Sequence, residues 1–150
     1  MENQALLDLN FKMWLLFSDL HHKMVAVRQS ELNQYNITTR QLRILRVIEG
    51  LGANARISEI AKLLERKVDV VSRQTVMLEK DGLIKRVQDK PKSRLLRLEL
   101  TDKGKKLLNK IHRSKGMNEV ISVLTEQERQ QIYAALNRVL NKLNEYSAKQ

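Results

Sequence analysis

The chain of 150 residues contains no cysteine, a single proline and five glycines. Without cysteine it can form no disulfide, no thiolate zinc site and no thiol-based redox switch. Aromatic residues make up only 4% of the sequence, whereas 42% of the residues are hydrophobic and 30% are charged. Because few residues interrupt helices and the apolar fraction is that of a folded protein, the composition predicts a helix-rich globular chain with one folding unit, residues 1–150.

The sequence also has no long apolar run. No stretch approaches the roughly 18 apolar residues that a transmembrane helix needs. The opening residues MENQALLDLN lack the basic segment with which a secretory signal peptide starts. We therefore expect a cytoplasmic protein with no membrane partner.

The motifs of common catalytic sites are missing as well. The sequence contains no glycine-rich phosphate loop, no nucleophile elbow and no His-Glu-x-x-His motif. Its three histidines are His21, His22 and His112, and adjacent histidines on a helix point in different directions, which suits joint chelation poorly. We expect exposed or core-rim histidines rather than metal ligands, with His112 and acidic residues of the first helix as the minor alternative. The chain is predicted to be no enzyme and to use no cofactor and no metal.

Charge of one sign is concentrated in the middle of the chain. The formal net charge is +11, and residues 37–115 carry 21 Lys and Arg against 9 Asp and Glu. The flanking residues 1–36 and 116–150 are close to neutral. A basic surface concentrates polyanions around itself, and nucleic acid is favoured over lipid because no apolar run adjoins the basic stretch.

Helix signals fill the first part of the chain. Apolar residues at three- and four-residue steps predict a long amphipathic helix over Leu6–Leu32. Its apolar stripe is wider than one contact needs, which favours a second subunit as a partner. Thr38–Gln41 has the pattern of a capping box and predicts a second helix, which ends at Gly50–Gly52.

Two short helices follow with the spacing of a helix-turn-helix motif. Ser58 is expected to cap the first of them, which ends near Arg66-Lys67. Asp69 is expected to cap the second, which continues to Asp81-Gly82. The inward positions of this second helix are Val71, Thr75 and Leu78.

The rest of the chain is predicted to form a hairpin followed by two helices. Residues 83–87 and 96–100 are predicted strands, joined by the polar turn 89–93. Thr101 is expected to cap a helix that ends around residues 114–116, and a second capping box at Thr125–Glu128 opens the last helix. The predicted fold is mainly α with a small β-hairpin wing, in the order α-α-α-α-β-β-α-α.

The second short helix carries the residue types that read DNA. Because Val71, Thr75 and Leu78 face inward, the other side chains in the N-terminal half of this helix face outward. In a recognition helix, the N-terminal half is the part that contacts base edges. Arg bonds guanine bidentately and Gln pairs with adenine. The hairpin adds cations that neutralise phosphates. The predicted DNA-binding residues are Lys67, Val70, Ser72, Arg73, Gln74, Met77, Lys90, Lys92 and Arg94.

These motifs together resemble the MarR family of winged helix-turn-helix transcriptional regulators. The resemblance rests on residues 58–64, on Val71-Ser72-Arg73 with residues 78–86, and on residues 100–104, and it extends to the terminal helices. Ser72 and Arg73 match the Ser/Thr-Arg pair of the family's recognition helix, and Arg94 matches the wing arginine. Lys92 stands where the family usually has an acidic residue, so the acidic–arginine pair within the wing is absent at that spacing.

The resemblance implies a homodimer that binds a pseudo-palindromic operator. Residues 37–100 would form the DNA-binding lobe, and residues 1–36 and 101–150 the dimerisation helices. Recognition helices would enter major grooves and wings minor grooves, and the regulator would be a repressor rather than an activator. A small aromatic or anionic effector is a further expected partner.

Three questions stay open at this stage. The side chains of Met13, Trp14, Phe17 and Leu45 either line an effector pocket or form core and subunit contacts, and packing is the commoner role of such stripes. A DNA-binding architectural protein without sequence preference is the alternative function. A protein-interaction adaptor with an incidental basic surface is the other.

Overall fold

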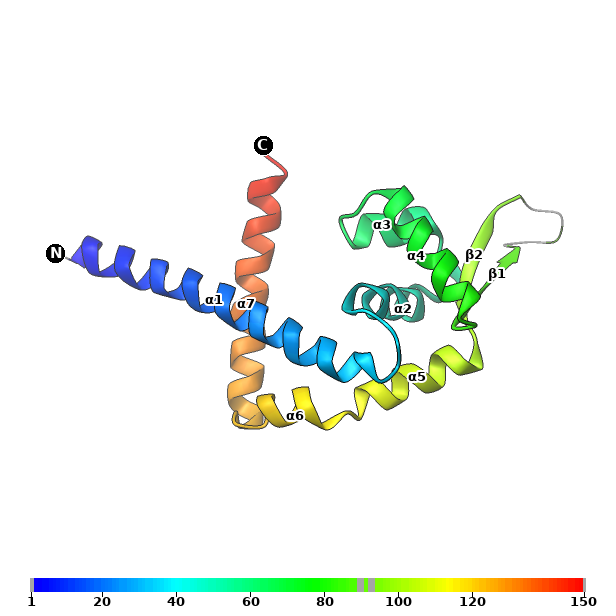
Figure 1. Cartoon of the computed structure of the whole chain (residues 1–150). Coiled ribbons are helices and arrows are strands. Elements are labelled where there is room, and N and C mark those ends of the chain that lie inside the picture. The colour runs from blue at the N-terminus through cyan, green and yellow to red at the C-terminus, as the bar shows by residue number, and fades with distance from the viewer. Residues whose placement is uncertain (1, 89–90, 92–93, 150) are drawn as a thin grey trace. The chain divides into compact units, whose positions relative to one another are not determined.

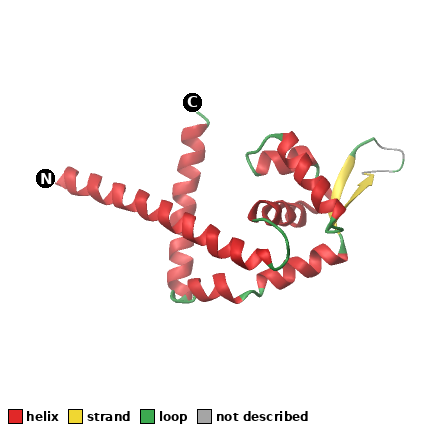
Figure 2. Ribbon diagram, viewed as in Figure 1, coloured by secondary structure: helices red, strands yellow, loops and turns green. Residues whose placement is uncertain are grey.

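The computed structural model describes residues 2–88, 91 and 94–149. Figure 1 shows the chain from its N-terminal to its C-terminal helix, and Figure 2 shows that helices dominate and that the two strands form one hairpin. The elements are α1 Glu2–Asn33, α2 Thr39–Leu51, the 3-10 turn η1 Gly52–Asn54, α3 Ile57–Leu63, α4 Val68–Lys80, β1 Ile84–Gln88, β2 Leu96–Leu100, α5 Asp102–His112, α6 Lys115–Ile121 and α7 Glu126–Ser147. Two compact units result, Met1–Ser114 and Lys115–Gln150.

The predicted fold class, mainly α with a hairpin wing, is confirmed. The order differs at two places, η1 and the helix α6, which the sequence did not reveal. α6 has seven residues, none of them buried, and its apolar residues Met117, Val120 and Ile121 span too short a stretch to predict a separate helix. Within the described part of the chain, no helix is long and apolar enough to cross a bilayer.

Both predicted capping boxes are present. The Thr38 hydroxyl accepts a hydrogen bond from the Gln41 amide at 3.1 Å, and the Thr38 amide donates to the Gln41 side chain at 2.9 Å. Thr125 and Glu128 form the same reciprocal pair at the start of α7. α2 ends where predicted, because Gly52 takes a φ of +52°, a conformation that costs glycine little.

Two predicted caps are wrong. α3 begins after Arg56, whose extended backbone serves as the N-cap without a side-chain hydrogen bond, and Ser58 lies inside the helix. α4 begins after Lys67 in the same way, so Asp69 sits in its first turn instead of capping it. α3 also ends earlier than predicted, at Leu63, because Glu65 takes a left-handed φ of +51° and turns the chain.

The core of the first unit forms around one face of α2. Ile44, Leu45 and Ile48 are each at most 2% exposed. They are joined in one buried cluster by side chains from the other elements, including Leu32, Ile60, Val71, Leu78, Ile84, Leu98 and Leu108. α2 contacts α1, α3, α4, α5 and β2 directly. The two helices of the helix-turn-helix motif are therefore held against a third helix and a sheet.

The hairpin is antiparallel and tied to the helices at its base. Its register pairs Ile84 with Leu100 and Gln88 with Leu96. The Leu98 amide donates to the Ala55 carbonyl at 2.8 Å, so the chain between η1 and α3 adds a backbone contact beside β2. These hydrogen bonds fix the direction in which the wing leaves the core.

The start of α5 approaches the base of β1 so closely that only glycine fits. A methyl group on Gly104 would meet the Leu83 carbonyl oxygen well inside van der Waals contact. Thr101, the N-cap, donates from its hydroxyl to the Gly82 carbonyl at 2.6 Å and holds the same junction.

We expect Gly104→Ala to lower the free energy of unfolding by about 1–3 kcal/mol, the usual cost of overpacking.

Gly50→Ala is the matched control, because nothing lies within 4 Å of a Cβ at that position in α2. It should raise stability slightly through helix propensity. Urea unfolding followed by circular dichroism measures both variants. Equal stability of the two variants would contradict this account of the α5 junction.

Candidate DNA-binding interface

α4 is anchored by three side chains on its inner face. Val71, Thr75 and Leu78 are buried, as the sequence predicted, at 1%, 0% and 0% exposure. The buried Thr75 hydroxyl donates to the Ser72 carbonyl at 2.8 Å, so burial leaves this polar group hydrogen-bonded. The inner face fixes the rotation of α4 about its axis and therefore decides which residues face outward.

The predicted base-reading residues lie on the rest of the helix surface. Lys67, Arg73 and Met77 are exposed, and Val70, Ser72 and Gln74 are half-buried. Met77 is 51% exposed, so its side chain is accessible on this surface. These six positions lie within the stretch 67–77, at the cap and in the first turns of one helix.

Arg73 is held in place by a carboxylate one turn earlier. Its guanidinium lies 3.2 Å from the Asp69 carboxylate, with both side chains more than two-thirds exposed. An exposed pair at this spacing contributes only about 0.3–0.5 kcal/mol. The pair therefore restrains the Arg73 side chain only weakly and can give way when a stronger hydrogen-bond acceptor arrives.

The wing places Arg94 in the open, as its position in a hairpin turn predicts. Arg94 is exposed, and so are Pro91, Leu95 and Leu96 beside it. The other two predicted wing residues, Lys90 and Lys92, lie outside the described residues. Lys67, Arg73 and Arg94 are thus the described cations of the predicted set, and each of them is exposed.

A three-residue ion cluster lies on the strands of the wing. Glu99 faces Lys85 across the hairpin at 3.4 Å, and Arg97 donates to the Glu99 carboxylate at 2.7 Å. The Arg97 hydrogen bond, with Lys85 adding a smaller effect, holds the pKa of Glu99 below its ordinary value. A second ion pair, Arg86 with Glu79 at 3.0 Å, joins β1 to α4.

Sequence reasoning did not single out a group of arginines beside the start of α4. Arg40 and Arg43 of α2 and Arg66 of the α3–α4 turn line a hollow of about 240 Å³, together with His21, Val25, Thr39 and Leu64. Each arginine contributes to the basic charge of residues 37–115, but they come from separate segments. Only the fold brings them together.

The four residues of the predicted effector pocket have different surroundings. Leu45 is fully buried in the core, whereas Met13 and Trp14 on α1 are 41% and 60% exposed and Phe17 is half-buried. Trp14 stacks on Phe11 with ring centroids 5.7 Å apart. None of the four lines the arginine hollow, so an effector site at these positions stays a prediction.

Metal ligands are not assembled in the described part of the chain. No group of three or more His, Asp or Glu side chains in it is placed to hold an ion. Of the three histidines, all are exposed, and His21 borders the arginine hollow.

Comparison with known proteins finds similarity over most of the chain. A family model described as HVO_A0114 matches residues 36–97, the segment from the start of α2 to β2. The HTH-type transcriptional repressor MdtR of Bacillus subtilis (strain 168) is 28% identical over 128 residues, which cover 84% of this chain and 79% of MdtR.

Two solved structures have the same fold. MepR of S. aureus in complex with DNA is 28% identical, with a TM-score of 0.70 over 85% of this chain and 96% of MepR. A mutant of MarR from E. coli in complex with operator DNA has a TM-score of 0.70 over 86% of this chain and 94% of MarR, at 22% identity.

The ion cluster of the wing makes stability depend on pH. The pKa of the Glu99 carboxyl is lowered in the folded state. The ionised carboxylate therefore contributes fully to folding stability above its pKa in the unfolded chain, about 4.3, and this contribution is lost as the pH falls through the folded-state pKa. We expect Glu99→Gln to lower the melting temperature at neutral pH. This difference from the unaltered protein should shrink as the pH is lowered below about 4.

Thermal melts at a series of pH values measure the effect, with Glu145→Gln in α7 as the control. Glu145 forms only an exposed pair with Lys142 at 3.1 Å. If the Glu99→Gln difference stayed constant from neutral to acid pH, the charge of Glu99 would not stabilise the wing.

Proposed function

We propose, from the chain's membership of the MarR family of winged helix-turn-helix regulators, that it regulates transcription by binding DNA. The observation that carries the proposal is the outer face of α4. Ser72 and Arg73 are at least partly accessible on it, at the two positions that match the family's recognition helix. The chain is also similar along most of its length to MepR, whose structure was solved with DNA, and to the repressor MdtR.

In this proposal α4 is the recognition helix. Arg73 leaves Asp69 and bonds a guanine edge in the major groove, and Gln74 pairs with an adjacent adenine. Lys67 at the helix N-terminus contacts a phosphate, aided by the partial positive charge of the helix end. Val70 and Met77 supply apolar contacts, for example to a thymine methyl group.

The wing supplies the second contact. Arg94, with Lys90 and Lys92 from the sequence, reaches the minor groove and the phosphates beside the site that α4 reads. Each cation that neutralises a phosphate releases counterions, so affinity falls as salt rises. The ion pairs of Glu99 and Arg86 hold the wing strands and α4 together while the tip contacts DNA.

We further propose that the regulator is a homodimer on a pseudo-palindromic operator, with residues 37–100 as the DNA-binding lobe and residues 1–36 and 101–150 as dimerisation helices. The support is the apolar surface that single units leave uncovered. α1 exposes Leu9, Phe11, Met13, Trp14, Leu15, Leu16 and Leu20, and α7 exposes Ile132, Tyr133, Leu136, Val139, Leu140 and Leu143. α7 has no buried residue at all among those described. Apolar faces of this size are covered in stable proteins.

The proposed mode of action is repression through occupation of the operator. An effector would relieve it only by binding the DNA-free and DNA-bound forms unequally. A chemical reaction is no part of the proposal, because the relatives are regulators and the interface offers DNA contacts rather than a nucleophile and base.

Substitution of the two arginines tests the DNA-binding proposal. We expect Arg73→Ala to weaken binding to the preferred operator by about 1–3 kcal/mol and to relax the preference at one base pair. Arg94→Ala should weaken all sequences alike and reduce the salt slope by about 1. Fluorescence anisotropy with labelled duplexes at several salt concentrations measures both.

Lys142→Ala is the control, because it removes one exposed cation from α7, an element that contains none of the proposed DNA contacts. The DNA affinity of the Lys142→Ala variant, and the slope of that affinity with salt concentration, should equal those of the unaltered protein. DNA binding that survives both arginine substitutions with the same salt slope would support an adaptor with an incidental basic surface instead.

Charged residues on the apolar faces test the dimer. Leu16 and Leu140 are 56% and 53% exposed in a single chain, so Leu16→Asp and Leu140→Asp should leave each unit folded but disrupt association. Sedimentation equilibrium should give twice the chain mass for the unaltered protein and one chain mass for the double variant. Leu63→Asp on α3, at a site 58% exposed, should remain dimeric. A monomer before any substitution would refute the dimer.

A further inference from the structure

The outer face of α5 carries a row of positive charge that none of the proposed DNA contacts uses. Residues 102–113 contain five cations and one carboxylate, that of Asp102. The buried residues Gly104, Leu108 and Ile111 fix the rotation of α5 against the core, so the cations lie on the opposite side of the helix. These exposed cations, here called the α5 stripe, are Lys103, Lys105, Lys106, Lys110 and Arg113.

The cations of the α5 stripe form no ion pairs, in contrast to cations on other helices. Arg46 of α2 pairs with Glu49 at 2.8 Å, and Arg73 of α4 pairs with Asp69 at 3.2 Å. In the α5 stripe, the four side chains other than that of Lys103 form no hydrogen bond or ion pair with any residue that the structure describes. Their charges therefore remain available to an anion from outside the chain.

The placement of these charges opposes helix formation. Lys106 and Lys110 are four residues apart, a spacing at which like charges repel each other along a helix. Lys103 and Lys105 lie close to the start of α5, where the helix dipole disfavours positive charge. The stability of α5 alone does not account for cations at these positions, and a bound polyanion would offset both effects.

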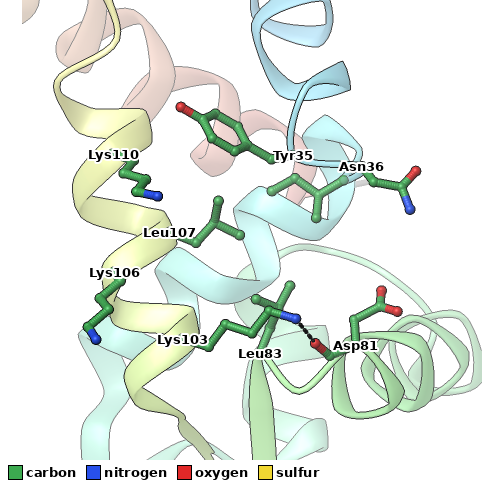
Figure 3. A pocket seen from close by; sticks show the side chains of 9 residues that line it. Tyr35, Asn36, Asp81, Leu83, Lys103, Lys106, Leu107 and Lys110 are labelled. Atoms are coloured by element: carbon green, nitrogen blue, oxygen red, sulfur yellow. Dashed lines mark hydrogen bonds between the residues drawn. The ribbon is translucent and has the colours of Figure 1, made fainter.

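The α5 stripe begins at the end of α4 that the proposed base contacts do not use. α4 spans about 20 Å, with Lys67 before its first residue and Asp81 after its last. Lys103 donates to the Asp81 carbonyl at 2.7 Å, as the dashed line in Figure 3 shows. Lys106 and Lys110 continue along the same side of α5 and border the same hollow (Figure 3). The stripe is thus separated from the N-terminal half of α4 by most of the length of that helix.

The chemistry of the α5 stripe favours duplex DNA among the possible anionic partners. A lipid surface requires a free apolar helix face, but Leu108 and Ile111 are 0% and 3% exposed. Protein interfaces are depleted in lysine, whereas interfaces with DNA are rich in positive charge. Proteins that bind single strands stack the bases on aromatic side chains, and α5 contains no aromatic residue.

We propose that the α5 stripe binds the phosphate backbone of a second DNA duplex, so that the protein holds two DNA segments at once. From Lys103 to Arg113 the stripe extends about 15 Å along the helix. Duplex DNA carries one phosphate for about every 1.7 Å of its axis, so each cation meets a phosphate within reach. Contacts to phosphates carry no sequence information, and the second duplex can therefore have any sequence.

This inference rests on the proposed function only for the first duplex, the one that α4 reads. Binding of a duplex by the α5 stripe requires neither α4 nor the wing. It is also compatible with the proposed dimer, because the exposed apolar faces that support the dimer belong to α1 and α7.

The α5 stripe is tested first in the Arg73→Ala/Arg94→Ala variant, which lacks the main proposed contacts of α4 and the wing. Its affinity for a labelled duplex of random sequence is measured by fluorescence anisotropy at several salt concentrations. We expect residual binding that weakens as salt rises. Adding Lys106→Gln and Lys110→Gln should lower the slope of log affinity against log salt by about 2, because each neutralised phosphate contributes about 0.9.

Arg138→Gln/Lys142→Gln in the same background is the matched control, because it removes two exposed cations at the same four-residue spacing from α7. The salt slope of this control should be unchanged. Equal slopes with and without the α5 substitutions would overturn the site, and so would an equal loss in the α7 control, which would attribute the effect to net charge. Binding of labelled polyglutamate without binding of the duplex would assign the stripe to an acidic protein instead. Circular dichroism melts show that the variants are folded.

The holding of two duplexes is measured on beads that carry the preferred site obtained by selection from random duplexes. After the protein is loaded, a labelled duplex of random sequence is added and the retained label is counted. We expect the Lys106→Gln/Lys110→Gln variant to load equally but to retain about fivefold less label, or less still, than the unaltered protein. Equal retention would overturn the binding of a second duplex. Failure of the unaltered protein to load would refute the proposed function, and the titration in the Arg73→Ala/Arg94→Ala background would still decide on the stripe.

Discussion

Burial of one face of α2 is the constraint on which the rest of the proposed DNA-binding lobe depends. Ile44, Leu45 and Ile48 point into a single apolar cluster, and full burial of such a side chain stabilises the folded state by about 1.5–3 kcal/mol. Every neighbouring element contributes to this cluster from its own inner face. Once Val71 and Leu78 are committed to it, α4 has only one possible rotation, and Arg73 faces outward as a consequence.

The same constraint explains why the outward surface of α4 and the wing carries basic side chains. With Val71, Thr75 and Leu78 of α4 facing the core, Lys67 and Arg73 lie on its outward positions, and Arg94 is exposed on the wing. Asp69 lies beside Arg73 and forms with it an exposed pair that costs little to break. Stability and the proposed DNA recognition therefore use opposite faces of the same short elements.

How far the sequence predicted this arrangement depends on the range of the interactions involved. Both capping boxes and the end of α2 were predicted correctly because their partners lie within four residues. Ser58 and Asp69 were wrong as caps, since Arg56 and Lys67 provide extended backbone at positions that local residue preference does not identify. α6 was missed because its apolar pattern covers only seven residues, directly after the predicted end of the preceding helix.

The candidate sites divide in the same way. The outward residues of α4 follow from helix periodicity once three inward positions are known, so they could be listed from the sequence. The arginine hollow could not, because His21, Arg40 and Arg66 come from three segments that only the tertiary structure brings together. Local sequence patterns likewise do not decide whether Met13 or Trp14 contacts a ligand or a second chain.

Sequence preference is the property that separates a regulator from a general DNA-binding protein. Selection from a pool of random duplexes yields the preferred site, and the dissociation constants for that site and for random DNA are then compared at physiological salt. We expect a pseudo-palindromic site that is bound about a thousandfold or more tightly than random DNA. Near-equal dissociation constants for the two would contradict it and identify an architectural DNA-binding protein.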